Sequence, residues 1–506
     1  MTKSTDLGWT RMSVAAILSI AAILTGARSS SAQNFRTLAS FNNTNGASPR
    51  ADLVQGLDGN FYGTTLYGGA NSNNICYTFG CGTVFRITPA GVLTTLYSFC
   101  AQPNCNDGAL PYAGLVLGTD GNFYGTTYNG GATGACGISG CGTVFKITPA
   151  GALSTLYLFC NRRTVCGDGS LPTGSLIEGS DGYLYGTTQD GGTGPSCPFS
   201  YGGGCGTVFK LSTAGKLTTL HSFLMSDGAT PWAGLVQGSD GNFYGTTSEQ
   251  ESGSGTVFKI TASGAFTSLY TFCTEANCAD GKTPYSGLVQ GADGSFYGTT
   301  FEGGDTNWGT AFKIDSAGHL TRLYSFCAKA NCADGGSVYA GLVQANDGNF
   351  YGVTNLGAPT TNGTVFKLTP NGTLTTVHNL QSSEGSGLYG GVVQSTSGAF
   401  YGATFYGGAS DACQSGCGTV FTVSANLGRF VETLPASGKV GAAVKILGTA
   451  LTGSTLVTFN GVSASFRVVS PSEITTNVPA GATTGTVKVL TPGGTLKSNV
   501  PFTVVQ

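Results

Sequence analysis

The sequence predicts an all-β protein, made of a seven-bladed β-propeller closed by its N-terminal strand and a following immunoglobulin-like β-sandwich. Three observations predict this fold class. One unit of 50 to 62 residues recurs seven times along the chain. Glycine, aromatic and β-branched residues dominate this unit, as in short strands joined by tight turns. The markers of the unit stop near residue 425, where a different pattern of strands begins.

The composition agrees with many short strands and excludes one class of partner. The chain has 506 residues, of which 82 are glycine, and only 9% of its residues are charged. A chain of this length needs several domains or a repeat array, because single hydrophobic cores stop growing well below it. The formal net charge is -2, and no stripe of Lys and Arg occurs. We therefore expect no nucleic acid partner, since phosphate binding needs clustered cations.

The first 32 residues are typical of a signal peptide. Lys3 and Arg11 precede an apolar run from Val14 to Leu24, and the small residues at 30–32 offer a cleavage site. The apolar run is too short to remain as a membrane-spanning helix. We therefore expect a protein that is secreted or held at the cell surface, with the periplasm as an alternative and no membrane span after cleavage.

Sixteen cysteines occur as eight local pairs, which predicts disulfide bonds in an oxidising compartment. The predicted pairs are Cys76–Cys81, Cys100–Cys105, Cys136–Cys141, Cys160–Cys166, Cys197–Cys205, Cys273–Cys278, Cys327–Cys332 and Cys413–Cys417. A structural zinc site would need two close pairs brought together, or a nearby histidine, and none of the three histidines lies near a pair. We therefore expect no metal there. Each bridge closes a short loop and should stiffen that loop rather than stabilise the whole fold.

Two sequence markers define the repeated unit. Tyr-Gly-Thr-Thr begins at Tyr62, Tyr124, Tyr185, Tyr244 and Tyr297, with variants at Tyr351 and Tyr401. Gly-Thr-Val-Phe begins at Gly82, Gly142, Gly206, Gly255, Gly363 and Gly418, with a variant at Gly309. In the second copy, the expected strands are 114–117, 123–127, 142–148 and 153–159, joined by tight turns such as Asp-Gly-Asn. Each copy therefore predicts one four-stranded blade.

The two ends of the array predict how it closes. Residues 35–41 match the pattern of a fourth strand, whereas the seventh copy ends at residues 418–423 without one. The N-terminal strand should therefore complete the last blade and leave no open strand edge. We expect the propeller to occupy residues 33–425.

The motifs of the unit also point to a known family. Asp-Gly-Asn-Phe-Tyr-Gly-Thr-Thr, the Gly-Gly that follows it, and Gly-Thr-Val-Phe-Lys-Ile-Thr recur between residues 35 and 425. This pattern resembles the GloVer tandem repeats of bacterial exported "choice-of-anchor" proteins. It is similar, more loosely, to propeller repeats in bacterial two-component sensor ectodomains. The resemblance implies export and a repeat fold, and it carries no assigned activity.

Residues 426–506 lack the repeat markers and predict a separate module. Short alternating strands are expected at 444–448, 457–462, 485–489 and 502–504, which is typical of a β-sandwich. Phe-Asn-Gly-Val at 459–462 and Val-Pro-Ala-Gly at 478–481 resemble an IPT/TIG domain. This resemblance implies a spacer or interaction module rather than an enzyme.

One aligned column of side chains precedes the innermost strand of each copy. Its members are Arg50, Tyr112, Thr173, Trp232, Tyr285, Tyr339 and Tyr389. In a propeller these residues would surround the mouth of the central channel, on the face with the longer, cysteine-bearing loops, where functional surfaces are usually built. Aromatic faces stack on sugar rings and other planar ligands, so the column predicts binding of a glycan or protein ligand. Packing between neighbouring blades is the alternative explanation.

A second column carries acidic residues in three adjacent copies: Asp190, Glu249 and Glu302. Paired carboxylates could act as acid and base on a glycosidic bond or hold a calcium ion, and the alternative is solvated loop charge. Asp-Gly pairs also recur between copies, at Asp107, Asp168, Asp227, Asp280 and Asp334. One carboxylate per loop is sparse for calcium, and turn formation explains the pairs.

The preferred hypothesis is a non-catalytic extracellular binding or scaffold protein that acts through its loop face. One alternative is a polysaccharide hydrolase or lyase that uses the three carboxylates named above, and another is a structural component of the cell surface. No nucleophile elbow, nucleotide-binding loop or metalloprotease helix occurs in the sequence. We therefore expect no cofactor, with calcium as the remaining alternative.

Overall fold

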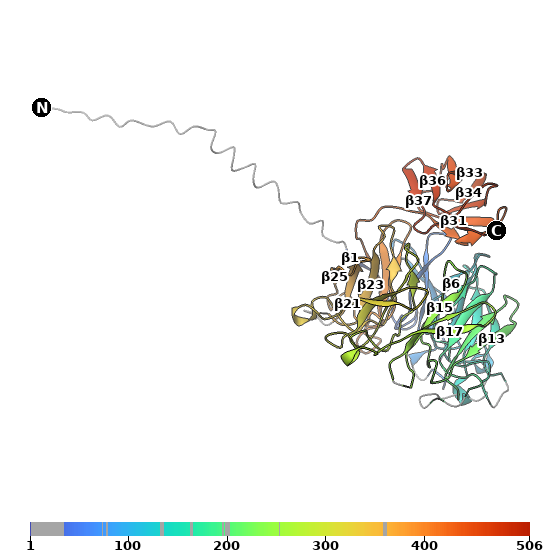
Figure 1. The fold of residues 1–506 in the computed structure, drawn as a ribbon, viewed down its shortest axis with the longest axis vertical. Coiled ribbons are helices and arrows are strands. Elements are labelled where there is room, and N and C mark those ends of the chain that lie inside the picture. The colour runs from blue at the N-terminus through green and yellow to red at the C-terminus, as the bar shows by residue number, and fades with distance from the viewer. Residues whose placement is uncertain are drawn as a thin grey trace.

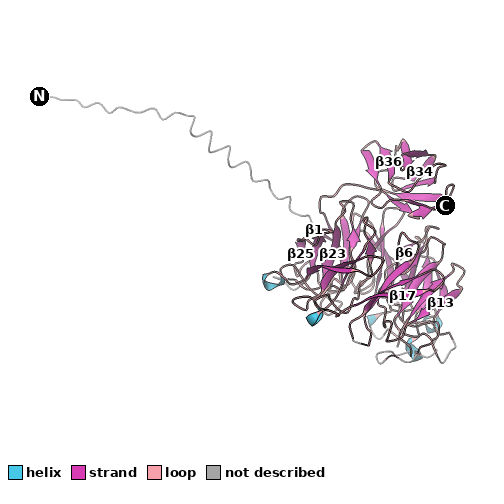
Figure 2. Cartoon of the chain, viewed as in Figure 1, coloured by secondary structure: helices cyan, strands magenta, loops and turns pink. Residues whose placement is uncertain are grey.

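The computed structural model describes Met1 and residues 35–505, with gaps at 73, 77–78, 132–135, 162–164, 195–196, 198–202, 252 and 358–361. Apart from Met1, the expected signal peptide lies outside the described residues. The described chain is built from strands, and its helical segments are short 3-10 turns (Figure 1, Figure 2). These turns are η2 (Pro103–Cys105), η3 (Gly137–Ser139), η4 (Ala276–Cys278) and η5 (Ala330–Cys332). Within the described residues, no helix is long and apolar enough to cross a membrane.

Each of the seven repeats forms one four-stranded antiparallel sheet. Repeats one to three contain β2 (Val54–Gln55), β3 (Phe61–Thr65), β4 (Thr83–Ile87) and β5 (Leu93–Ser98); β6 (Val116–Leu117), β7 (Phe123–Thr127), β8 (Thr143–Ile147) and β9 (Leu153–Leu158); and β10 (Ile177–Glu178), β11 (Leu184–Thr188), β12 (Thr207–Leu211) and β13 (Leu217–Ser222). Repeats four and five contain β14 (Val236–Gln237), β15 (Phe243–Thr247), β16 (Thr256–Ile260) and β17 (Phe266–Thr271); and β18 (Val289–Gln290), β19 (Phe296–Thr299), β20 (Thr310–Ile314) and β21 (Leu320–Ser325). Repeat six contains β22 (Val343–Gln344), β23 (Phe350–Thr354), β24 (Thr364–Leu368) and β25 (Leu374–Asn379).

The seventh sheet takes its fourth strand from the other end of the chain. Its own strands are β26 (Val393–Gln394), β27 (Phe400–Thr404) and β28 (Thr419–Val423). Strand β1 (Phe35–Ser40) pairs antiparallel with β28, from Phe35 opposite Val423 to Ser40 opposite Thr419. The N-terminal strand therefore occupies the position that its sequence pattern predicted.

The second strand of each repeat is buried, and its sequence explains why it packs so closely. In repeat one, β3 reads Phe-Tyr-Gly-Thr-Thr and all of its residues are buried. A side chain at Gly63 would not fit, because its Cβ would lie 2.7 Å from both Leu53 Cδ2 and Phe85 Cζ. The hydroxyl oxygens of Thr65 and Thr83 lie 2.8 Å apart and join the second strand to the third. The Tyr-Gly-Thr-Thr marker is thus a packing requirement of the sheet.

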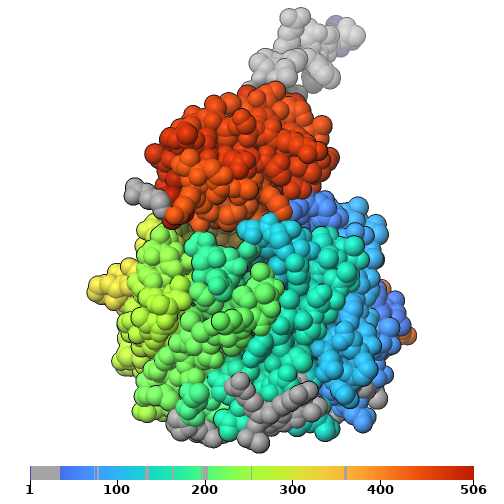
Figure 3. Space-filling model, turned by 90° about the vertical axis from the view of Figure 1, so that its right-hand side faces the viewer, coloured from blue at the N-terminus to red at the C-terminus, as the bar shows by residue number. Residues whose placement is uncertain are grey.

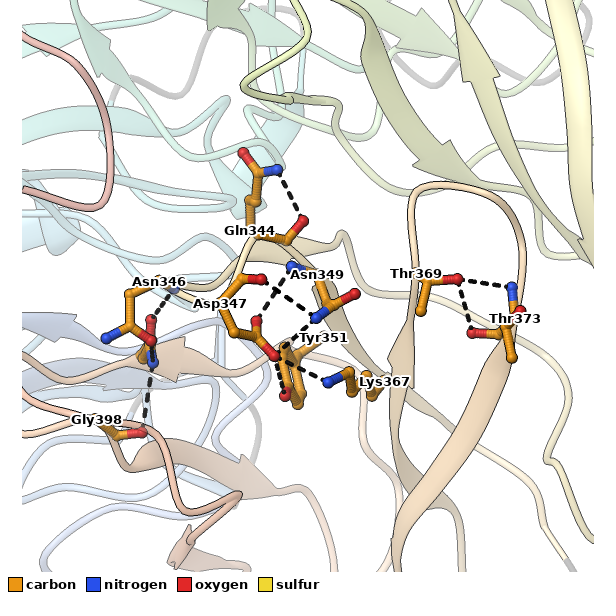
Figure 4. A network of polar contacts seen from close by, with 11 residues as sticks. Gln344, Asn346, Asp347, Asn349, Tyr351, Lys367, Thr369, Thr373 and Gly398 are labelled. Atoms are coloured by element: carbon orange, nitrogen blue, oxygen red, sulfur yellow. Dashed lines mark hydrogen bonds and ion pairs between the residues drawn. The ribbon is translucent and has the colours of Figure 1, made fainter. Parts of the chain in front are cut away.

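A hydrogen-bonded turn joins the first and second strands of each repeat. In the sixth repeat, Asp347 accepts hydrogen bonds from the backbone N–H of Asn349 at 3.1 Å and from the Tyr351 hydroxyl at 3.2 Å (Figure 4). Lys367 Nζ on the third strand forms an ion pair with the same carboxylate at 2.9 Å. The Asp-Gly-Asn motif therefore builds the tight-turn end of the sheets, opposite the end that carries the cysteines.

Neighbouring sheets contact each other through a repeated aromatic pair. At six junctions, the second-strand tyrosine of one sheet contacts the second-strand phenylalanine of the next. These pairs are Tyr62–Phe123, Tyr185–Phe243, Tyr244–Phe296, Tyr297–Phe350, Tyr351–Phe400 and Tyr401–Phe61, with ring centroids 3.9 to 4.3 Å apart. At the remaining junction, Leu184 packs in one cluster with Tyr124. The contacts therefore run from the first sheet to the seventh, and the Tyr401–Phe61 pair joins the seventh to the first.

The residue that ends the first strand makes a second contact between sheets. The Gln237 side-chain oxygen accepts a hydrogen bond from the backbone N–H of Ser180 in the preceding repeat at 2.9 Å. The equivalent acceptors in other repeats are Gln55, Glu178, Gln290, Gln344 and Gln394. In repeat two the position is Leu117, whose side chain has no acceptor atom and is buried. This junction alone therefore presents an apolar side chain where the other six present a polar one.

The C-terminal strands form two packed sheets and a short parallel pair. One sheet contains β29 (Glu432–Leu434), β31 (Ala443–Leu447), β35 (Glu473–Asn477) and β34 (Phe466–Ser470), and the other contains β33 (Val462–Ala464), β32 (Leu456–Phe459), β36 (Val487–Thr491) and β37 (Gly494–Lys497). β30 (Ser437–Gly438) pairs in parallel with β38 (Thr503–Val504). Side chains from both sheets, such as Ile446 and Val489, share one buried cluster, which is the core of a β-sandwich.

This sandwich lies against the tight-turn end of the repeat sheets (Figure 1, Figure 3). Leu447 is only 4% exposed and belongs to the same apolar cluster as Leu117. Ser472 Oγ donates a hydrogen bond to the backbone oxygen of Leu57, in the turn of repeat one, at 2.7 Å. Leu117 and Leu447 thus belong to one apolar cluster that extends from the repeat sheets into the sandwich.

Candidate functional site

A single cavity collects the predicted aromatic column at the point where the chain enters the first strand of each repeat. Its volume is about 520 Å³, and all seven repeats contribute to its lining. The lining includes every member of the column: Arg50, Tyr112, Thr173, Trp232, Tyr285, Tyr339 and Tyr389. Thr173 is buried, and the other six are half-buried. The column therefore surrounds a shared space, whereas the tyrosine–phenylalanine pairs described above fill the interior between sheets.

Six of these side chains contact one another around the cavity. Ring centroids lie 5.1 to 5.8 Å apart for Tyr112–Trp232, Trp232–Tyr285, Tyr285–Tyr339 and Tyr339–Tyr389. The Arg50 guanidinium carbon closes the series, at 4.1 Å from the centroid of the Tyr112 ring and 4.6 Å from that of Tyr389. Thr173 of the third repeat has no ring, and the large Trp232 ring of the fourth repeat contacts Tyr112 of the second repeat directly. We call these six side chains (Arg50, Tyr112, Trp232, Tyr285, Tyr339 and Tyr389) the aromatic girdle.

The tyrosines of the aromatic girdle remain protonated at neutral pH. Burial raises the pKa of Tyr285 to about 12, and the negative charge of Glu249 adds to this effect. Burial also raises the pKa of Tyr112, although the nearby charge of Arg50 lowers it. The rings therefore offer apolar faces together with neutral hydroxyl groups that donate and accept hydrogen bonds.

A carboxylate outside the predicted set faces the same cavity. Asp52 accepts a hydrogen bond from the backbone N–H of Gly391, in the neighbouring seventh repeat. The surrounding protein raises the pKa of the Asp52 carboxyl, while the Gly391 N–H lowers it. The equivalent residues in the other copies are Gly114, Ser175, Gly234, Gly287, Gly341 and Gly391. A single aspartate in a column of glycine and serine was the signal that could have identified it.

The three predicted catalytic carboxylates occupy different environments. The charge of Glu302 adds to burial in raising the pKa of Glu249, and the charge of Lys282 opposes them. Lys282 Nζ also forms an ion pair with Glu302 at 2.8 Å. Asp190, by contrast, is fully buried. The fold therefore brings Glu249 and Glu302 together and keeps Asp190 inside the protein, and a catalytic role for these residues stays a prediction.

The Asp-Gly pairs between repeats organise the connecting loops. Asp107 is fully buried and accepts hydrogen bonds from the Tyr97 hydroxyl at 2.8 Å and from the backbone N–H of Ala101 at 2.9 Å. The same contact with a fourth-strand side chain is made by Asp168, Asp280 and Asp334 with tyrosine, and by Asp227 with His221. The chain itself thus supplies donors to these carboxylates, which agrees with the prediction that they form turns; calcium binding stays the alternative explanation.

All sixteen cysteines form the eight predicted disulfide bonds. The fold adds contacts between bridges that the short spacings did not predict. Cys76 Sγ lies 3.8 Å from Cys100 Sγ, and Cys141 Sγ lies 3.8 Å from Cys166 Sγ. Repeats one and two therefore each bring two disulfide bonds into van der Waals contact. This is the arrangement of paired cysteines that zinc would need, but every cysteine sulfur is bonded to another sulfur.

Comparison with known families accounts for both parts of the chain. The Gloeobacter/Verrucomicrobia repeat matches residues 27–197, 77–279 and 272–464. The chain belongs to this family. Residues 430–504 match the IPT/TIG domain. Both resemblances expected from the sequence motifs are thereby confirmed, and neither names a ligand.

Individual proteins add little about activity. No curated protein matches the chain. A solved fungal alcohol oxidase of the AA5 family, in complex with copper, aligns over 94% of this chain and 100% of its own length, with a TM-score of 0.51 and 12% identity. A putative 6-phosphogluconolactonase from Bacteroides uniformis aligns over 68% of this chain and 88% of its own, with a TM-score of 0.44 and 17% identity. At such identities, the likeness to the oxidase concerns the fold alone.

Proposed function

We propose that the seven sheets close into a seven-bladed β-propeller, and that the protein is a non-catalytic extracellular binding protein which holds a carbohydrate at the aromatic girdle. Contacts that run through all seven sheets and return to the first support the closed ring. Eight disulfide bonds support an oxidising setting outside the cytoplasm. The observation that carries the binding function is the aromatic girdle, which gathers five rings at one cavity.

The chemistry of the cavity favours a sugar over a purely apolar ligand. Pocket volumes of about 300 to 1,000 Å³ are usual for small ligands, and this cavity has about 520 Å³. The ring faces suit the C–H faces of a sugar, whereas the tyrosine hydroxyls and the Asp52 carboxylate suit its hydroxyl groups. A purely apolar ligand would leave those polar groups without partners.

The position of the sandwich supports binding at the opposite end of the sheets, where the aromatic girdle lies. Its hydrogen bond with Leu57 lies at a tight turn, while the aromatic girdle lies where the chain enters the first strands. The IPT/TIG domain would then act as a spacer or interaction module that leaves the cavity accessible.

Glycan array binding of the full chain tests this function, with Trp232→Ala and Tyr285→Ala as the site variants. Trp308→Ala is the matched control, because Trp308 is 40% exposed and lies outside the cavity lining. We expect each site variant to weaken binding by about tenfold or more, since buried aromatic contacts dominate binding sites, and the control to bind as the wild type does. Absence of binding to every glycan, or an equal loss in the control, would contradict the proposal.

A polysaccharide hydrolase is the second candidate, because Glu249 and Glu302 interact through their charges near Tyr285. Two neighbouring carboxyl groups, one acting as acid and the other as base, are what cleavage of a glycosidic bond requires. Release of reducing ends from polysaccharides is the assay. Turnover that persists in a Glu249→Gln, Glu302→Gln double variant would exclude this role.

A further inference from the structure

Arg50 is the one charged member of the aromatic girdle. The other copies place tyrosine, tryptophan or threonine at this position. The guanidinium carbon of Arg50 lies 4.1 Å from the centroid of the Tyr112 ring and 4.6 Å from that of Tyr389, so two aromatic rings flank the cation. Cation–π contacts of this kind hold the guanidinium in place without using any of its N–H groups.

The N–H groups of Arg50 have no protein acceptor among the described residues. Two other arginines are engaged by protein acceptors: Arg36 donates a hydrogen bond to the backbone oxygen of Pro89 at 3.2 Å. Arg322 donates to the backbone oxygen of Ala279 at 3.0 Å and forms an ion pair with Asp305 at 2.6 Å. Within the described part of the chain, Arg50 makes only its two ring contacts, at the lining of the cavity. Five N–H donors on a half-buried cation are therefore left for something inside the cavity.

A guanidinium held in this way is suited to one kind of ligand group. Its planar fork of donors matches the two oxygens of a carboxylate, and the pair forms two parallel charge-assisted hydrogen bonds. Because the rings already restrict the side chain, little conformational entropy is lost when the pair forms. We infer that Arg50 binds the carboxylate of an acidic sugar, so that the ligand of the aromatic girdle is a glycan that contains uronic acid. This inference rests on the proposed function.

The acidic residues around the cavity are compatible with an anionic ligand at Arg50. Lys282 pairs with Glu302 at 2.8 Å and offsets its charge. The backbone N–H of Gly391 donates a hydrogen bond to Asp52 and disperses the charge of its carboxylate. A carboxylate at Asp52 repels a ligand carboxylate, so we expect the ligand anion at Arg50 and not beside Asp52. Its oxygens then serve the neutral hydroxyl groups of the sugar.

A matched pair of probes isolates the role of charge. Oligogalacturonate carries the carboxylates, and the methyl ester of the same oligomer lacks their charge. Calorimetric titration of the full chain should show tighter binding of the acid than of the ester. Arg50→Gln should weaken binding of the acid by about 10- to 100-fold, the usual range for a lost charge-assisted pair, and weaken binding of the ester much less. The affinity of Arg50→Lys for the acid should lie between those of the wild type and Arg50→Gln, because an ammonium group keeps the charge without the fork.

Two further variants separate the possible failures. Arg36→Gln removes an arginine outside the cavity and should leave both affinities unchanged. Trp232→Ala should weaken binding of both probes. If Trp232→Ala weakens binding and Arg50→Gln does not, the girdle binds sugars and the assignment of Arg50 is wrong. If a sulfated oligosaccharide binds and the uronate does not, the carboxylate is the wrong anion. If no glycan binds at all, the proposed function fails together with this inference.

Discussion

Replacing Phe41 by alanine tests whether the N-terminal strand closes the ring of sheets. Phe41 directly follows β1, which pairs with β28 in the seventh sheet. Its side chain is 0% exposed and packs edge-on against Phe85 of the first repeat, with ring centroids 5.1 Å apart. The ring of Phe41 therefore joins the seventh sheet to the first, and its removal leaves a cavity at that junction.

The magnitude of the effect follows from the burial of the ring. A buried phenylalanine hides at least about 150 Å² of surface, and about 25 cal/mol for each Å² of apolar surface gives about 4 kcal/mol. Phe→Ala substitutions in cores cost about 3–5 kcal/mol in the same sense. We therefore expect Phe41→Ala to lower the free energy of unfolding by about 4 kcal/mol. Phe159→Ala is the matched control, because Phe159 is also 0% exposed and packs edge-on against Phe209 at 5.3 Å.

Urea unfolding followed by tryptophan fluorescence measures both variants on the full chain. Trp232 and Trp308 are the tryptophans outside the first 32 residues and report on the repeat sheets. Equal slopes of free energy against urea make the two losses comparable. If Phe159→Ala costs the full amount and Phe41→Ala costs less than about 1 kcal/mol, β1 is a loose attachment. The reasoning that it seals the ring would then be wrong.

Two further predictions concern protonation and the paired disulfide bonds. Burial raises the pKa of Glu432 from 4.5 to about 7, so the folded protein retains a proton that the unfolded chain releases, and stability should fall as pH rises from about 5 to 7. Glu432→Gln should remove this fall in urea unfolding at pH 5 and pH 8, and identical pH dependence in the two proteins would count against it. Cys136→Ser leaves Cys141 without its partner, and its Sγ lies 3.8 Å from Cys166 Sγ. Attack of the Cys141 thiolate on the Cys160–Cys166 bond forms a Cys141–Cys166 bond and releases the thiolate of Cys160. Peptide mapping after alkylation should then find the free thiol at Cys160, and a free thiol at Cys141 would rule out this exchange.

Local features of this protein were predictable because a few neighbouring residues decide them. Strand β7 lies at Phe123–Thr127, as the Asp-Gly-Asn turn and the marker after it predicted. The first strand of the same repeat was expected over 114–117 but covers only Val116–Leu117. The first strand of every repeat is equally short, so this length belongs to the repeated unit. In the second repeat, the Gly114 N–H donates to Ser175 Oγ of the next repeat at 3.0 Å, outside its own sheet.

The disulfide bonds show the same division between local and distant effects. Cys413 and Cys417 are separated by only 4 residues, so their pairing could be predicted from spacing alone. The contact between Cys76 Sγ and Cys100 Sγ at 3.8 Å was not predictable in this way. It joins the loop after β3 to the loop after β5, and the distance between those loops depends on how the sheet is built.

By itself, the sequence determined the repeat, its turns and strands, the cysteine pairs, and the residues that stand in the aligned column. Each of these depends on neighbours along the chain or on comparison between copies. Only the tertiary structure decided that the column surrounds a cavity, that Tyr112 and Tyr389 flank Arg50, and that Asp52 shares the space. These contacts join different repeats, and their geometry follows from the packing of whole sheets, which no short stretch of sequence contains.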